Sequence, residues 1–101
     1  MASVRHTSRA RADLLDIWLG IAVDNPDAAD RVLDRLEARV RILRQWPNSG
    51  VACPAVEHEA RMLVEHPYVI LYRVVGDDVH VVRVLHGARD IDGALFKAGI
   101  E

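Results

Sequence analysis

Histidines and carboxylates are the residues of this chain whose types suit metal binding or acid–base chemistry. Of the five histidines, His66, His80 and His86 lie in or beside the predicted strands. Their spacing matches no recognised metal-ligand pattern, and no pair of cysteines accompanies them. His80 and His86 share one face of a predicted strand, where about 20 Å of extended chain separates them. We therefore expect no metal site and no cofactor.

Two pairs of carboxylates, Asp13 with Asp16 and Glu57 with Glu59, have the types needed for general acid–base catalysis. Carboxylates at such spacings are common on solvated helices and loops, so neither pair indicates an enzyme. Cys53 is the single cysteine and is interpreted as an incidental thiol in a loop. The chain also lacks a glycine-rich phosphate loop and a serine-centred nucleophile elbow.

Arginines in the second half of the chain indicate binding more than catalysis. Of the 13 basic residues, only Lys97 is a lysine, which also fits a genome that prefers arginine codons. Arginine forms planar, bidentate contacts with carboxylates. Arg61, Arg73, Arg83 and Arg89 lie in or beside the predicted strands. They either pair locally or bind acidic groups of a partner.

Size and composition predict one domain spanning residues 1–101. The net charge is -2, which argues against a protein that grips many phosphates of nucleic acid. A lone cysteine fits a reducing compartment. No apolar run approaches the roughly 20 residues needed to span a bilayer, and the segment Met1–Arg11 has no apolar core of a signal peptide. We expect a cytoplasmic protein without membrane contact.

The periodicity of the apolar residues predicts two helices joined by a tight link. The first begins at Thr7 or Ser8, either of which can cap it, and runs to about Asp24. The break at 25–27 contains Pro26, which suits the first turn of a second helix from about Asp27 to Trp46. The predicted buried stripes are Ala10, Leu14, Ile17, Trp18 and Ile21, and then Ala29, Val32, Leu33, Leu36, Val40, Leu43 and Trp46.

The remaining elements are predicted strands. The predicted ranges are Ser3–Thr7, Glu59–Glu65, Tyr68–Val75 and Val79–His86, with a hairpin turn at 76–78, a loose stretch from 47 to 54, and a short helix or tail at 91–100. The order β-α-α-β-β-β indicates an α+β fold. In this fold a helical hairpin packs on a small, mostly antiparallel sheet.

Both faces of the predicted sheet are largely apolar. Regular alternation places Ile70, Tyr72 and Val74 on one face, and Val69, Leu71, Arg73 and Val75 on the other. It likewise places Val79, Val81, Arg83 and Leu85 together. One helical hairpin covers one face, so we expect the second apolar face to stay open for a partner. The alternative is that the loop from Pro47 to His58 and the C-terminal tail cover it.

An ordered set of short motifs resembles the ParE toxins of the RelE/ParE superfamily. The set consists of SRARADLLDIWLGI at 8–21, NPDAA at 25–29, Leu43, Pro47 and Gly50, Arg61, HPYVI with Tyr72-Arg73-Val74 at 66–74, and RVLHG with Arg89-Asp90 at 83–90. The resemblance covers roughly residues 8–90. It implies a helical hairpin on an antiparallel sheet.

The resemblance also implies a function and partners. The protein would be the toxin of a type II toxin–antitoxin pair that inhibits DNA gyrase by binding, without catalysis. A ParD-like antitoxin would neutralise it and would supply the only contact with DNA. We expect the antitoxin- or target-binding residues to be Arg61, Arg73, Arg83, His86 and Arg89.

Two alternatives remain within the superfamily. RelE-like toxins are endonucleases that cut mRNA on the ribosome, and Arg61, Arg89 and His86 would serve that reaction here. The place of one active-site arginine is held by Val69, the place of a later tyrosine is near Leu95, and the strands contain no lysine. These departures favour gyrase inhibition. The third reading is an inactive relic that binds antitoxin and acts only as a co-repressor.

Overall fold

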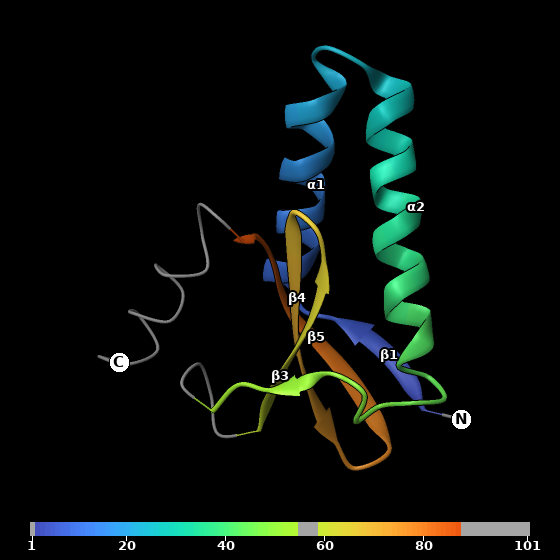
Figure 1. The fold of residues 1–101 in the computed structure, drawn as a ribbon, viewed down its shortest axis with the longest axis vertical. Helices are drawn as coiled ribbons and strands as arrows, with labels where there is room; N and C mark the ends of the chain where they lie inside the picture. The colour runs from blue at the N-terminus through green and yellow to red at the C-terminus, as the bar shows by residue number, and fades with distance from the viewer. Residues whose placement is uncertain (1, 55–58, 88–101) are drawn as a thin grey trace.

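The computed structural model describes residues 2–54 and 59–87, which form two helices on one side of a β-sheet (Figure 1). The elements are β1 (Ser3–His6), α1 (Ser8–Ala22), α2 (Pro26–Ile42), β2 (Val51–Ala52), β3 (Ala60–Glu65), β4 (Tyr68–Val75) and β5 (Asp78–His86). The α+β class and the helical hairpin predicted from the sequence are confirmed. Arg89 and the predicted segment 91–100 lie outside the described residues.

The sheet has five strands in the order β1-β5-β4-β3-β2. β1 runs parallel to β5, and the other neighbouring strands are antiparallel. The short β2 was not predicted, because two residues are too few to show an alternating pattern. It pairs Val51 with Met62 and Ala52 with Arg61, and so extends the sheet beyond β3.

Side-chain caps start both helices near the predicted places. The Thr7 hydroxyl accepts a hydrogen bond from the Ala10 amide at 3.0 Å, and the Asn25 side-chain oxygen accepts one from the Ala28 amide at 3.0 Å. Each cap satisfies an amide that has no partner within its helix. Pro26 follows at the first position of α2, where its missing N–H costs nothing. The short link between α1 and α2 therefore produces an antiparallel hairpin.

α2 ends at Ile42, four residues before the predicted end. The chain tightens there, since the amides of Leu43 and Arg44 bond to carbonyls three residues back, at 3.0 and 3.1 Å. Pro47 disfavours helical geometry in the residue before it. Trp46 therefore lies outside the helix, with 65% of its surface exposed. The prediction that Trp46 belongs to the buried stripe is wrong.

The main core lies between the helices and the sheet. The helices contribute buried side chains at Ala10, Leu36, Val40 and Leu43. The sheet contributes buried side chains at Leu63, Tyr68, Ile70, Tyr72, Val79, Val81 and Val84. Leu14, Ile17, Val32 and Leu33 pack against this cluster while only partly buried. Most of the predicted helical stripes thus do face the sheet.

A β-bulge in β5 changes which residues share a face. Leu71 is opposite Arg83 while Tyr72 is opposite Val81, so Val82 is an extra residue on β5. Val84 consequently joins Val79 and Val81 on the helix side, and Leu85 faces the other side. The prediction of regular alternation along this strand is therefore wrong beyond Val82. Both faces of this strand are largely apolar, so the sequence does not reveal the shift in alternation that the bulge causes.

The turn after α2 is fixed to the sheet by a buried tyrosine. The Tyr72 hydroxyl donates to the Pro47 carbonyl at 2.8 Å and accepts from the Gly50 amide at 2.9 Å. Burial raises the pKa of Tyr72, against smaller opposing effects of its Gly50 bond and of Arg61. The hydroxyl thus keeps the proton that it donates. The Arg61 side chain adds a bond of 2.8 Å to the Gly50 carbonyl.

Gly50→Ala should destabilise the fold, because the new Cβ would lie 2.6 Å from the Tyr72 hydroxyl and 2.9 Å from the Met62 carbonyl. We expect a loss of about 1–3 kcal/mol in the free energy of unfolding, measured by urea denaturation. Gly20→Ala is the control. It meets nothing within 4 Å and should stabilise α1 by up to about 1 kcal/mol. Wild-type stability of Gly50→Ala would contradict the close packing of Gly50 against Tyr72 and Met62.

Candidate functional site

Beyond the end of β1, residues at the start of α1 form hydrogen bonds with the exposed backbone edge of β5. β1 pairs with β5 only as far as His6 and Val81. The Thr7 amide then donates to the Val81 carbonyl at 3.0 Å, and the Thr7 hydroxyl donates to the Val82 carbonyl at 2.9 Å. Nearly two turns later, Asp13 accepts from the Val84 amide at 3.0 Å. The helix therefore continues the hydrogen bonding of the strand.

Asp13 also forms a two-point ion pair with Arg83. The guanidinium donates to the two carboxylate oxygens, Nε to Oδ2 at 2.7 Å and Nη2 to Oδ1 at 3.0 Å. The side chains of Arg83 and Asp13 are 25% and 14% exposed, so water screens the pair only in part. Such bidentate, charge-assisted bonds are among the stronger contacts that side chains make. Asp13 thus anchors α1 to β5.

This arrangement gives two sequence candidates a structural role. Arg83, expected to bind antitoxin or target, already holds a carboxylate of its own chain. Asp13, considered together with Asp16 for acid–base chemistry, accepts three hydrogen bonds, while Asp16 is exposed. The sequence offered no signal for the pair, because 70 positions separate its members.

The other candidate binding residues do not gather at one place. Arg61 bonds to the carbonyls of Gly50 and Asn48, beside the turn after α2. Arg73 is half-buried on β4, and His86 lies at the end of β5 with its ring edge-on to Tyr68 at 5.7 Å. The four candidates in the described residues, Arg61, Arg73, Arg83 and His86, therefore form no single cluster.

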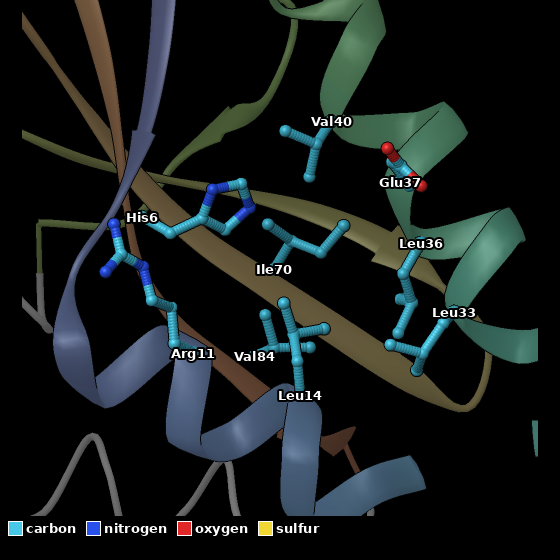
Figure 2. A pocket seen from close by; sticks show the side chains of 9 residues that line it. All are labelled: His6, Arg11, Leu14, Leu33, Leu36, Glu37, Val40, Ile70 and Val84. Atoms are coloured by element: carbon cyan, nitrogen blue, oxygen red, sulfur yellow. The ribbon is translucent and has the colours of Figure 1, made fainter.

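A pocket of about 280 Å³ opens between the helical hairpin and the sheet (Figure 2). Its apolar lining comes from both helices and both central strands, namely Leu14, Leu33, Leu36, Val40, Ile70 and Val84. His6, Arg11 and Glu37 add polar groups to the same lining. The sequence predicted most of these apolar residues as core. The structure shows that they do not close completely upon one another.

His6 is the titratable group of the pocket with a displaced pKa. Burial lowers the pKa of His6 from its usual 6.5, the nearby Arg11 lowers it further, and Glu37 opposes both. The neutral imidazole is therefore favoured in the folded protein. The pocket at neutral pH presents an apolar interior with one cation and one carboxylate beside it.

The second face of the sheet carries a smaller apolar cluster of Val69, Leu71 and Leu85, with Met62 packed against it. All three cluster residues are buried. The prediction that this face stays open for a partner is therefore wrong for these side chains. Sequence alternation identified the apolar character of the face but not its degree of burial.

The chemistry available in residues 2–54 and 59–87 is limited. Within these ranges, no group of three or more His, Cys, Asp or Glu side chains is placed to hold a metal ion. Neither of the two described helices has the length and apolar character needed to cross a membrane. The arrangement instead offers an apolar pocket with charged neighbours, which suits the binding of a polypeptide.

Comparison with known proteins agrees with this geometry. Residues 4–91 match the family described as the ParE toxin of the type II toxin–antitoxin system parDE, and the chain belongs to that family. It is 40% identical to toxin RelE2 of Caulobacter vibrioides, with 88% of this chain and 99% of the relative covered. It is 36% identical to the putative toxin Y4kP of Sinorhizobium fredii, over 82% and 85% of the two chains.

A solved structure confirms the fold. The chain of a chromosomal ParDE toxin–antitoxin system from P. aeruginosa superposes with a TM-score of 0.74 at 28% sequence identity. The superposition covers 85% of this chain and 96% of the other. The protein is therefore a type II toxin of the RelE/ParE superfamily, as the sequence motifs predicted.

Asp13→Asn should unfold more easily than the wild type, since an amide cannot replace the charged, three-bond acceptor. We expect a loss of about 2–4 kcal/mol in the free energy of unfolding. Asp16→Asn is the matched control on the exposed side of the same helix and should change stability by less than about 0.5 kcal/mol. Equal stability of the two variants in urea would show that Asp13 is not an anchor.

Stability should fall in mildly acidic solution because of His6. Its pKa is lower in the folded protein than the unfolded value of 6.5, so the unfolded chain takes up the proton first as the pH falls. This contribution is complete above pH 6.5 and is lost as the pH drops toward the folded pKa. His6→Gln should lessen the decrease in unfolding free energy between about pH 7.5 and 5.5. His66→Gln, at an exposed site, is the control for the loss of a histidine. An unaltered pH dependence in His6→Gln would contradict the assignment.

Proposed function

We propose that this toxin arrests growth by binding DNA gyrase, without cutting RNA, and that a ParD-like antitoxin neutralises it. The observation that carries the proposal is the apolar second face of the sheet. Val69 occupies the position at which the otherwise similar RelE-like ribonucleases carry an active-site arginine. Its side chain is buried with Leu71 and Leu85, next to Met62.

Cleavage of RNA needs positive charge to stabilise the developing phosphorane and a group that moves protons. The Val69 cluster supplies neither, because its members are aliphatic or a thioether. The chain has two tyrosines, Tyr68 and Tyr72, and both are buried. The Tyr72 hydroxyl is already bound to Pro47 and Gly50. This supports a non-catalytic mode of action.

The pocket beneath the helical hairpin is the site that we assign to the antitoxin. An amphipathic segment of a partner would place an apolar side chain against Leu33, Leu36 and Ile70. Arg11 and Glu37 beside it would pair with charges of opposite sign on that segment. The similar structure from P. aeruginosa bears the name of a ParDE toxin–antitoxin system, which supports a ParD-like partner.

Arg73 stays a candidate for antitoxin or target binding on the second face. It follows Leu71 by two positions along β4, so both side chains lie on that face. Arg61 and Arg83 are held by groups of this chain, and we assign them to positioning. His86 stays a binding candidate at the end of β5.

The alternative is ribosome-dependent cleavage of mRNA. Relatives of this chain are named RelE toxins, which is the observation in its favour. Arg61 would have to act while its guanidinium is bonded to two backbone carbonyls, those of Asn48 and Gly50. The geometry of the described residues therefore argues against a role of Arg61 in RNA cleavage.

Purified toxin should inhibit supercoiling of relaxed plasmid by gyrase, and addition of the cognate antitoxin should restore it. A coupled translation reaction with the same toxin should leave its mRNA intact. Normal supercoiling at large toxin excess together with cut mRNA would establish the RelE-like reading. Absence of both effects, with antitoxin binding retained, would identify an inactive co-repressor.

A further inference from the structure

The exposed side of α1 carries an apolar stripe. Leu15, Leu19 and Val23 are 56%, 49% and 84% exposed, and they follow one another at intervals of four residues. Residues so spaced lie on one side of a helix. Ala12 and Ser8, also exposed, continue the row toward the start of α1. Apolar residues spaced by three and four positions are typical of the seam between two paired helices.

The charges of α1 are arranged against its own dipole. Arg9 and Arg11 lie in or next to its first turn, and Asp24 follows its end. The first turn has no acidic residue, and the last turn has no basic one. A helix is stabilised by anions at its start and cations at its end, so this arrangement is unfavourable for an isolated α1. An antiparallel neighbour with the same charges would reverse the effect at both ends.

We propose that the exposed stripe of α1 binds a second copy of this chain, with the two α1 helices antiparallel about a twofold axis. The twofold axis then passes between positions 15 and 16, and the two Leu15 side chains meet beside it. Ala12 lies opposite Leu19, and Ser8 lies opposite Val23. Each large side chain away from the axis faces a small one, so the stripe is complementary to itself.

The electrostatic fit follows from the same register. With Ser8 opposite Val23, the guanidinium of Arg9 lies beside the last turn of the second α1. The C-terminal end of the helix dipole and the carboxylate of Asp24 make that turn negative. The pairing occurs twice because of the twofold symmetry. Charge complementarity thus selects the antiparallel orientation and identifies a second copy as the occupant.

The dimer is expected to be weak and independent of the antitoxin pocket. α1 has 15 residues and is about 22 Å long, so its stripe is smaller than the roughly 800 Å² per partner of a standard interface. We expect a dissociation constant in about the micromolar-to-millimolar range. Leu14 lines the pocket while Leu15 points to solvent, so both surfaces can be occupied at once.

Sedimentation equilibrium of the full chain, up to about 1 mM, measures the association directly. The wild type should show a monomer–dimer equilibrium. Leu19→Glu places a carboxylate in the seam and should raise the dissociation constant at least about tenfold. Val64→Glu is the control, because Val64 is equally exposed but lies on β3. Circular dichroism verifies that both variants stay folded.

Disulfide cross-linking tests whether the two copies of position 15 lie close together at the proposed twofold axis. In a Cys53→Ser background, Leu15→Cys should oxidise readily to a covalent dimer, since the two copies of position 15 meet. Val75→Cys, exposed at the end of β4, should not. A monomer at every concentration, or equal weakening by Leu19→Glu and Val64→Glu, would overturn the proposal. So would loss of antitoxin binding in Leu19→Glu with a monomeric wild type, which would assign the stripe to the antitoxin.

Discussion

The bond between Asp13 and the edge of β5 is the contact on which the rest of the structure depends. β1 covers β5 only as far as Val81, and beyond that point Thr7 and Asp13 supply the missing partners. The Arg83 guanidinium holds the Asp13 carboxylate in place at 2.7 and 3.0 Å. Because α1 is the first arm of the hairpin, this contact also sets where α2 lies above the sheet. The pocket lined by Leu14, Leu36 and Ile70 exists because the hairpin is held there.

The local features of the fold were readable from the sequence, because each depends on neighbouring residues. Thr7, Asn25 and Pro26 start the helices through side chains and ring geometry that act within a few positions. The period of the apolar residues identified both helices and the three long strands. The features that depend on distant residues were not predicted. The bulge at Val82 arises from the pairing of β5 with β4, and the bond of Tyr72 to Pro47 joins residues 25 positions apart.

In the candidate site too, local features could be predicted from the sequence, whereas contacts between distant residues could not. The sequence singled out arginines in the strand half as binding candidates, but residue type alone does not tell an internal ion pair from an external contact. Arg83 finds Asp13, which is 70 positions away, and Arg61 finds the turn at Gly50, so both stabilise the fold. The apolar second face was read correctly as apolar, yet Val69, Leu71 and Leu85 are buried. We assign partner binding chiefly to the pocket under the hairpin and to the exposed stripe of α1, which composition does not reveal.

Hydrogen exchange at the Val84 amide, followed by NMR, tests the central contact at a single atom. No strand of the described residues pairs with this edge beyond Val81, so its protection depends on the Asp13 carboxylate. We expect this amide to exchange as slowly as amides inside the β4–β5 ladder. Exchange as fast as that of an amide open to water would show that α1 is not anchored there. The positions of the hairpin and of the pocket would then need another cause.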